Sequence, residues 1–283
     1  MTTWGYAGPW YFEFTTHDGD NPEDPAVILN RRLDFLAEHN LTTTGYPLQS
    51  FANLPEQDRE QIARRLQDED LALTCHVGCR YLSVSDDEAA AYNEKAIALL
   101  DRYLPMMRSP IATISKGPGH RFDLEQPLEE QLARLARGFA PVARACHERN
   151  IPLGIENHGD YYCSDLVQLC ESVPHLYIFL DTGNTYLIGE RPLPAFEVAA
   201  PYVIGTHFKD HIVEPVARGL HFDIHGAPLG QGHVPLRACY RLLKQHAPFP
   251  DDLVMQMEMI CPKDDGITPP ECLERSLAFV RSL

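Results

Sequence analysis

Residues 151–181 read IPLGIENHGDYYCSDLVQLCESVPHLYIFLD and contain the pattern that decides the fold. A short apolar run at 151–157 precedes an amphipathic stretch at 165–172, and a second apolar run follows at 176–181. Short apolar runs are typical of buried strands, whereas apolar residues spaced by three and four are typical of one helix face. This segment therefore predicts a strand, a helix and a second strand.

The same alternation occurs eight times along the 283 residues. The expected strands are Trp4–Phe12, Leu41–Pro47, Leu71–Val77, Ile111–Lys116, Ile151–Asn157, Leu176–Asp181, Val203–Phe208 and Leu253–Met259. The expected helices are Pro25–Glu38, Pro55–Asp68, Asp86–Tyr103, Leu128–Cys146, Asp165–Ser172, Pro192–Ala200, Pro235–Gln245 and Pro269–Arg281. Eight such units in about 280 residues fit a (β/α)8 TIM barrel, an α/β fold. A doubly wound sheet is less favoured, because no GxGxxG motif follows the first strand.

We expect one barrel domain over residues 1–283, because no linker and no shift in composition interrupts the chain. The longest irregular stretch, at about residues 210–234, lies between the seventh strand and its helix. In a barrel this position is a loop on the active face, and long loops in compact domains often serve function.

Composition narrows the classes of function. Hydrophobic residues make up 44% of the chain and charged residues 23%, which is typical of a globular protein. The formal net charge of −16 disfavours binding to nucleic acid or to an anionic membrane, because phosphate contacts require a basic surface. Neither a signal peptide nor an apolar run of about 18 residues is evident, and the eight cysteines form no CxxC pair. We expect a cytoplasmic protein with reduced thiols and predict no oligomeric state.

Four residues with metal-binding side chains lie at the ends of predicted strands. Glu156 lies in GIENHG, Asp181 in FLDTGN, His207 in GTHFKD and Glu258 in MQMEM. Each alone is compatible with helix capping or a structural hydrogen bond, but an acid in an apolar strand is costly unless it is paired, protonated or metal-bound. Four such residues at one barrel mouth predict a metal site. Three carboxylates and one imidazole favour Mn²⁺, and Mg²⁺, Co²⁺ or Zn²⁺ also suit this site.

A divalent ion next to a carbonyl group acidifies the neighbouring C–H bond and stabilises an enediolate. Glu156 and Glu258 are then the candidate acid/base residues on opposite faces of the reacting carbon. Return of the proton to the far face gives epimerisation, and its return to the adjacent carbon gives isomerisation. Loss of a leaving group gives dehydratase or lyase chemistry, and the residues leave these outcomes open.

Together with LGQGHVPL at residues 229–236, the strand-end motifs resemble the xylose isomerase-like TIM barrel superfamily of sugar phosphate isomerases and epimerases. The resemblance covers nearly the whole chain. In the ketose 3-epimerases of this superfamily, the residues matching Glu156, Asp181, His207 and Glu258 hold one divalent metal, and both glutamates act as acid/base groups. The chain departs from that pattern at Asn184, where the family often has histidine, and in LTTTGYPL at 41–48, which lacks a common acidic residue.

Several further polar residues are candidate substrate contacts, each with a structural explanation beside it. These candidates are His76, Lys116, His158, Asn184, Lys209 and His225. Asp210 is a candidate partner of a ligand histidine, or a turn cap. Asp223 forms a DxH pair with His225 and is a candidate for a second metal, as in related nucleases. The aromatic residues Trp4, Tyr6, Trp10 and Phe12 suit either a wall beside the sugar or core packing.

The resemblance and the residues together predict a metal-dependent isomerase or epimerase of carbohydrate metabolism, acting on a small keto-sugar. We expect an unphosphorylated substrate, because no phosphate-binding glycine loop or arginine cluster is evident. A lyase or dehydratase acting on a keto-polyol or 3-keto-glycoside is the alternative. An AP endonuclease-like phosphodiesterase is less favoured because of Asn184 and the net charge of −16. A non-catalytic binding protein is also less favoured, since all four ligand positions carry competent residues.

Overall fold

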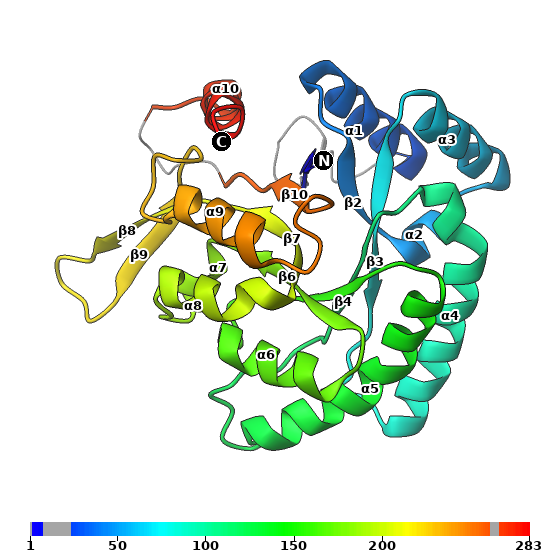
Figure 1. Cartoon of the computed structure of the whole chain (residues 1–283), viewed down its shortest axis with the longest axis horizontal. Coiled ribbons are helices and arrows are strands. Elements are labelled where there is room, and N and C mark those ends of the chain that lie inside the picture. The colour runs from blue at the N-terminus through cyan, green and yellow to red at the C-terminus, as the bar shows by residue number, and fades with distance from the viewer. Residues whose placement is uncertain (1, 8–23, 261–265) are drawn as a thin grey trace.

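The computed structural model of the chain describes residues 2–7, 24–260 and 266–283. Eight parallel strands close into a barrel in the order β1-β10-β7-β6-β5-β4-β3-β2 (Figure 1). The barrel strands are β1 (Thr3–Tyr6), β2 (Thr43–Pro47), β3 (Ala72–Gly78), β4 (Ala112–Ser115), β5 (Leu153–Glu156), β6 (Leu176–Asp181), β7 (Val203–Phe208) and β10 (Val254–Met257). The predicted (β/α)8 TIM barrel is therefore confirmed.

Helices cover the outside of the barrel and connect successive strands. They are α1 (Pro25–His39), α2 (Leu48–Asn53), α3 (Glu56–Asp68), α4 (Asp86–Met107), α5 (Leu128–Glu148), α6 (Cys163–Ser172), α7 (Asn184–Leu187), α8 (Pro192–Ala199), the 3₁₀ helix η2 (Ala200–Tyr202), α9 (Leu236–His246) and α10 (Pro269–Val280). The short helices α2 and α7 were not predicted. Each is close to one turn long, so neither carries the repeated spacing by which a helix is detected.

The core lies between the strands and this layer of helices. The predicted face of α5 is buried, with Leu132, Leu135, Phe139, Val142 and Cys146 all at 5% exposure or less. A smaller apolar cluster of Ile111, Phe179, Ile204 and Val254 lies apart from the main core. These packed layers hold the strand ends, and thus the site, in fixed positions.

Two expectations about secondary structure need correction. The first strand ends at Tyr6 instead of extending to Phe12, and Trp10 and Phe12 lie outside the described residues. The stretch at 210–234 is not irregular, because β8 (His211–Pro215) and β9 (Phe222–Gly226) form an antiparallel hairpin beside the barrel. Its β-branched residues favour extended backbone even within a loop. Within the described residues, no helix is long and apolar enough to cross a membrane.

Candidate active site

Four side chains from four barrel strands meet at the carboxyl end of the barrel. Glu156 ends β5, Asp181 ends β6, His207 lies in β7, and Glu258 directly follows β10. One ligand atom from each residue lies within 4.8 Å of all the others. We call these four residues the ligand cluster. They are the residues for which the sequence predicted a metal site, and the parallel strands bring them to one edge because all strands end there.

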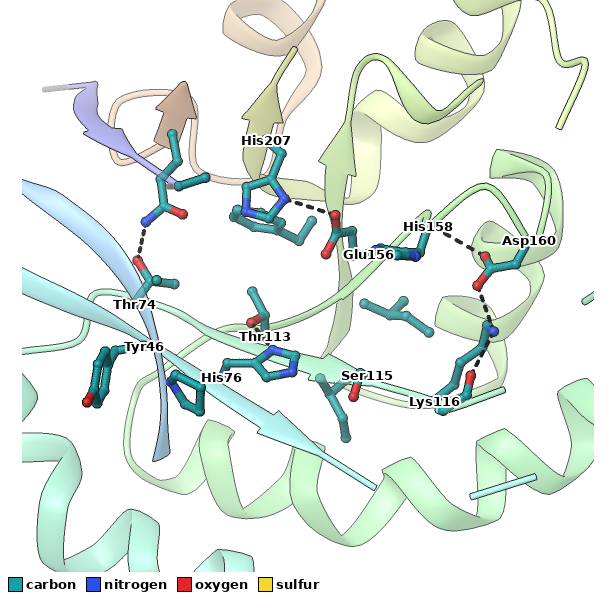
Figure 2. Close-up of a pocket in the computed structure, with 18 of the residues that line it drawn as sticks. Tyr46, Thr74, His76, Thr113, Ser115, Lys116, Glu156, His158, Asp160 and His207 are labelled. Carbon is teal, nitrogen blue, oxygen red and sulfur yellow. Dashed lines mark hydrogen bonds and ion pairs between the residues drawn. The ribbon is translucent and has the colours of Figure 1, made fainter. Parts of the chain in front are cut away.

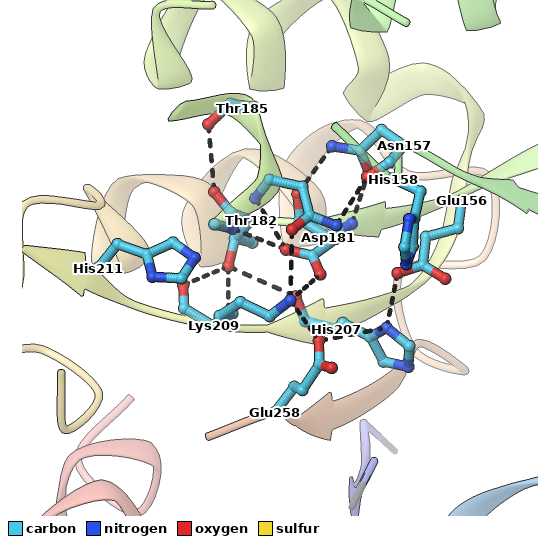
Figure 3. Close-up of polar contacts among 12 residues, drawn as sticks. Glu156, Asn157, His158, Asp181, Thr182, Thr185, His207, Lys209, His211 and Glu258 are labelled. Atoms are coloured by element: carbon cyan, nitrogen blue, oxygen red, sulfur yellow. Dashed lines mark hydrogen bonds and ion pairs between the residues drawn. The ribbon is translucent and has the colours of Figure 1, made fainter. Parts of the chain in front are cut away.

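Asp181 is held in place by hydrogen bonds that leave one oxygen directed at the cluster (Figure 3). Its Oδ1 accepts hydrogen bonds from the backbone amides of Gly183 at 2.8 Å and Asn184 at 3.0 Å. The side chain of Asn157 accepts from the Asp181 amide at 2.7 Å and donates to the Asp181 carbonyl at 2.8 Å. The side chain of Asp181 is fully buried, and burial raises the pKa of this carboxyl group to about 7.

His207 lies between two carboxylates. Its Nδ1 is 2.9 Å from Oε1 of Glu156 and 3.6 Å from Oε2 of Glu258, and the ring of Phe179 packs against it edge-on at 4.7 Å. Burial lowers the pKa of His207, but the attraction of Glu156 and then of Glu258 and Asp181 outweighs it and raises the pKa to about 9. Burial opposes ionisation of Glu156, but its contact with His207 lowers the pKa of this carboxyl group to about 2.

Lys209 was predicted to contact the substrate, but its side chain lies among the carboxylates of the ligand cluster and does not line the cavity. Its Nζ is 2.6 Å from Oδ2 of Asp181 and 2.6 Å from Oε2 of Glu258, and it donates to Oδ1 of Asn184 at 3.3 Å (Figure 3). Strand alternation correctly places Lys209 on the same face as His207. The nearby carboxylates then attract its ammonium group away from the cavity.

The ligand cluster fits a divalent metal ion. It offers three carboxylates and one imidazole, a donor set that suits hard ions such as Mg²⁺ and Mn²⁺. The three carboxylates still outnumber the two cations beside them, His207 and Lys209, and a bound metal ion would take the place of the proton on His207. In this fit Glu156, Asp181, His207 and Glu258 hold the ion. An ion held there polarises a carbonyl oxygen of a bound substrate and stabilises negative charge on it.

A cavity of about 550 Å³ opens beside the ligand cluster (Figure 2). Glu156 and His207 line it, as do the predicted substrate contacts His76 and His158. The Nδ1 of His76 is 2.9 Å from Oγ1 of Thr113, which fixes the orientation of its ring. Burial lowers the pKa of His76, so this imidazole is a neutral hydrogen-bonding group at neutral pH.

Lys116 also lines the cavity, but its charge is already neutralised. Its Nζ lies 2.6 Å from Oδ2 of Asp160 and donates to the carbonyl oxygens of Gly117 at 3.1 Å and Gly119 at 2.7 Å. The ammonium group also lies 4.9 Å from the centre of the Tyr161 ring. Lys116 and Asp160 therefore present an ion pair to the cavity, not a free cation.

Asp210 does not orient a ligand histidine. Its carboxylate accepts hydrogen bonds from the backbone amides of His211, Gly230, Gly232 and Val234, at distances between 2.9 and 3.1 Å. The alternative role as a turn cap therefore describes this residue. The motif LGQG supplies amides to Asp210 because its glycines allow a close approach, and a Cβ at Gly232 would lie 2.3 Å from Oδ1.

Three other predicted site residues lie away from the cavity. Asn184 is buried, and its Nδ2 donates to the carbonyl of Asn157 at 3.0 Å. His225 lies on β9, where its Nε2 is 3.5 Å from Oε2 of Glu214. Asp223 is paired in register with the same Glu214 on β8. In the part of the chain that the structure describes, the ligand cluster is the one group with metal-binding geometry, so Asp223 and His225 form no second centre there.

Gln256 and Arg32 are among the cavity-lining residues that were not predicted from the sequence. Gln256 projects into the barrel two positions before Glu258 and donates to Oγ1 of Thr74 at 2.9 Å. The spacing of two residues places Gln256 on the same face of the strand as Glu258, but nothing in the sequence indicated that it contacts the cavity. Arg32 reaches the cavity from α1, and no motif marks it.

Comparison with known proteins places this arrangement in a family. Residues 33–283 match the model of the xylose isomerase-like TIM barrel family. The chain belongs to this family. Among curated proteins, it is 26% identical over 151 residues to 3-oxo-isoapionate decarboxylase of Pectobacterium atrosepticum, an alignment that covers 51% of this chain and 52% of that protein. The chain spans about half the length of the curated relatives it matches.

Solved structures of xylose isomerase-like proteins share the whole barrel. A xylose isomerase-like protein from Mycobacterium smegmatis in complex with magnesium has a TM-score of 0.70 at 17% identity and covers 100% of this chain and 98% of its own. L-ribulose 3-epimerase has a TM-score of 0.69 at 16% identity, with 100% and 94% covered. A probable 3-DHS dehydratase of petrobactin synthesis from Bacillus anthracis has a TM-score of 0.65 at 16% identity, with 99% of both chains covered. At these identities the likeness establishes the fold alone.

Proposed function

We propose that this protein is a divalent-metal-dependent enzyme that removes a proton next to a carbonyl group of a keto-sugar and acts as an epimerase or isomerase. One observation carries the proposal. Glu156 belongs to the ligand cluster and at the same time lines a cavity large enough for a small sugar. A carboxylate in this position is beside both the charge that develops on the substrate and the carbon that loses its proton.

The residues divide the work as follows. Asp181 and His207 hold the ion, and Mn²⁺ is the ion we propose. Glu156 accepts the proton, because it faces the cavity and lies beside a cation that keeps its carboxyl group ionised: His207 in the metal-free protein, and the bound ion in the loaded protein. Glu258 is the candidate for the opposite face, where it would return a proton. General acid/base catalysis by such a group contributes about 10²–10⁴-fold to the rate.

The cavity wall supplies hydrogen bonds that orient the sugar. His76 and His158 present imidazoles, and the ion pair of Lys116 with Asp160 presents both a donor and an acceptor. Hydrogen-bonding groups of this kind suit the hydroxyl groups of a carbohydrate.

Elimination is a second candidate, and the position of Glu258 favours it. Its carboxylate is ion-paired with Lys209 at 2.6 Å, so Glu156 is the better placed of the two proposed acid/base groups. A single base is enough to start a dehydration, whereas epimerisation requires a proton donor on the opposite face. The similarity to a decarboxylase and to a probable dehydratase is compatible with this alternative.

The test is incubation of the Mn²⁺-loaded protein with a panel of keto-sugars in D₂O, followed by NMR. Deuterium in a recovered sugar or in its epimer supports the proposal, and formation of a dehydrated product supports elimination. The rate of deuterium exchange in Glu156→Gln should be at least about 100-fold lower than in the wild type. The exposed control Glu60→Gln on α3 should leave the rate unchanged. Chelator-insensitive exchange, or normal exchange in Glu156→Gln, would contradict the proposal.

A further inference from the structure

The charged residues that line the cavity are paired, with one exception. Lys116 pairs with Asp160 at 2.6 Å, and Glu156 pairs with His207 at 2.9 Å. Arg32 also lines the cavity, and no carboxylate among the described residues forms an ion pair with it. Its Nε is buried and has no hydrogen-bond partner there. The cavity therefore contains one guanidinium group without a counter-ion from the described part of the chain.

The barrel is built so that Arg32 reaches the cavity from outside the ring of strands. It lies on α1, and strands β1 and β2 pair at one position, Gly5 with Thr43. At no other position do the described residues of these two strands pair, and each strand carries a buried tyrosine, Tyr6 on β1 and Tyr46 on β2. The electrostatic neighbours of Arg32 are the hydroxyl groups of these two tyrosines, which carry no charge at neutral pH.

A guanidinium group that is partly buried, with its Nε fully buried, and that lacks an anion is energetically unfavourable. Burial lowers the pKa of Arg32, which reflects this cost, but arginine stays protonated at any pH at which the protein folds. Removing a charge from water is unfavourable unless a partner compensates for it. Such a group is kept where a ligand supplies the missing charge. Arg32 is thus the group in the cavity that most needs an anionic partner.

We propose that Arg32 binds a carboxylate group of the substrate, so that the enzyme acts on a keto-sugar acid and not on a neutral keto-sugar. This inference rests on the proposed function and specifies its substrate class. In the closed barrel β2 lies opposite β6, which carries Asp181 of the ligand cluster. A substrate that spans the mouth would place its reacting carbon at Glu156 and its carboxylate at Arg32.

The geometry favours a carboxylate over a phosphate group. A guanidinium group presents two parallel N–H donors that match the two oxygens of a carboxylate. A phosphate group usually needs several donors, often backbone amides at a helix N-terminus. Tyr46 adds one hydroxyl group beside Arg32, and Lys116, the one lysine that lines the cavity, is already paired with Asp160. The single guanidinium group of Arg32 therefore suits a carboxylate better than a phosphate group.

The test compares ligands that differ in charge and that lack the carbonyl group needed for turnover. Isothermal titration calorimetry with the metal-loaded protein measures the affinities for D-gluconate, sorbitol and sorbitol 6-phosphate. We expect gluconate to bind at least about tenfold more tightly than sorbitol, which corresponds to about 1.4 kcal/mol. Arg32→Met should reduce this ratio to about one, and Arg32→Lys should retain part of it because the charge remains.

The matched control is Arg64→Met on α3, which removes an exposed arginine and should leave the ratio unchanged. Thermal melting of each variant confirms that it is folded. Equal affinities for gluconate and sorbitol in the wild type, or an unchanged ratio in Arg32→Met, would overturn the inference. Tighter binding of sorbitol 6-phosphate than of gluconate, lost in Arg32→Met, would overturn the assignment of a carboxylate.

The outcome separates this inference from the proposed function, because the probes cannot react. Charge-selective binding without any exchange in D₂O would count against proton abstraction and leave the role of Arg32 in place. Exchange on neutral keto-sugars with unselective binding would count against the role of Arg32 alone.

Discussion

The ammonium nitrogen of Lys209 lies 2.6 Å from Oδ2 of Asp181, and the two side chains are 7% and 0% exposed. The same nitrogen contacts Glu258 at 2.6 Å. A cation of the protein itself therefore lies among the carboxylates that we propose as metal ligands. Burial lowers the pKa of Lys209, but the attraction of Asp181 and Glu258 outweighs it and holds this pKa above its ordinary value.

Lys209→Met should destabilise the metal-free protein, because it leaves two buried carboxylates without their nearest counter-ion. Breaking a buried ion pair by removing one partner costs about 3–5 kcal/mol. Urea unfolding in EDTA should show that the free energy of unfolding falls by this amount in the variant. Added Mn²⁺ should stabilise the variant more than the wild type. The control Lys244→Met removes a more exposed pair with Asp251 and should cost less than about 1 kcal/mol. Equal losses in both variants would contradict this account.

Asp181→Asn should weaken metal binding while preserving the local fold. The amide oxygen still accepts from the backbone of Gly183 and Asn184, but the charge of the ligand is lost. We expect one Mn²⁺ per chain in the wild type by elemental analysis, and an affinity at least about tenfold lower in the variant, since even residues that only orient metal ligands contribute 10–100-fold. Asp34→Asn, which changes an exposed carboxylate paired with Arg65, is the control and should retain the metal.

His211 should make the stability of the protein depend on pH. Burial, followed by repulsion from Lys209, lowers the pKa of this histidine from 6.5 to about 4. The unfolded chain takes up a proton as the pH falls through about 6.5, whereas the folded protein does so only near 4. The contribution of His211 is therefore complete above pH 6.5 and is lost between 6.5 and 4, with an upper limit of about 3 kcal/mol.

The measurement is the free energy of unfolding between pH 4 and pH 7 for the wild type and for His211→Gln. The variant should show a shallower dependence over this range. His221→Gln changes an exposed histidine of the same segment and should keep the wild-type slope. A slope that is unchanged in His211→Gln would assign the pH dependence to other groups.

Gly5→Ala should disrupt the junction of β1 and β2. A Cβ atom at this position would lie 2.1 Å from Oγ1 and 2.3 Å from the carbonyl oxygen of Thr43, so the strands would have to separate. We expect a loss of about 1–3 kcal/mol or more in thermal or urea unfolding. Gly45→Ala on the neighbouring strand is the control, because its nearest contact would be 3.8 Å away at Gln256. Similar stability of the two variants would show that the junction tolerates the added atom.

His225→Ala should leave metal content at one ion per chain and change KM by less than about threefold. The sequence predicted that this histidine contacts substrate or a second metal, but it lies on β9 next to Glu214 and does not line the cavity. Elemental analysis and initial-rate kinetics check this expectation. Loss of an ion would show that His225 binds metal, and a large increase in KM would show that it contacts the substrate.

The ligand cluster was predictable because of a property of the barrel. All eight strands are parallel, so every strand end lies at the same edge, and polar residues there meet without any knowledge of loop structure. Glu156, Asp181, His207 and Glu258 needed only the assignment of the strands. The helix face on α5 was predictable for a similar reason, because its apolar spacing extends over five turns.

Other parts of the site depend on contacts that a pattern does not specify. Parity places Lys209 on the face of His207, but whether its ammonium group turns to substrate or to Asp181 depends on the local charge. Arg32 lies within a helix. The spacing of apolar residues along a helix predicts which side chains face the core and which face solvent, but it does not predict which reach the cavity at the barrel mouth. Asp210 was ambiguous because three of its four backbone amide donors reach it only after the loop at 229–234 has folded.

Asp210 accepts hydrogen bonds from four backbone amides that lie on both sides of the β8–β9 hairpin. His211 begins the hairpin, and the other three donors follow it in the chain. One carboxylate thus closes the base of the hairpin, while its far end, including Leu220 and Phe222, is exposed to solvent. A segment clamped in this way can be shortened, lengthened or exchanged between relatives as a cassette, and the barrel strands need not adjust. The hairpin is therefore the natural place to insert new sequence into this barrel, whether by evolution or by design.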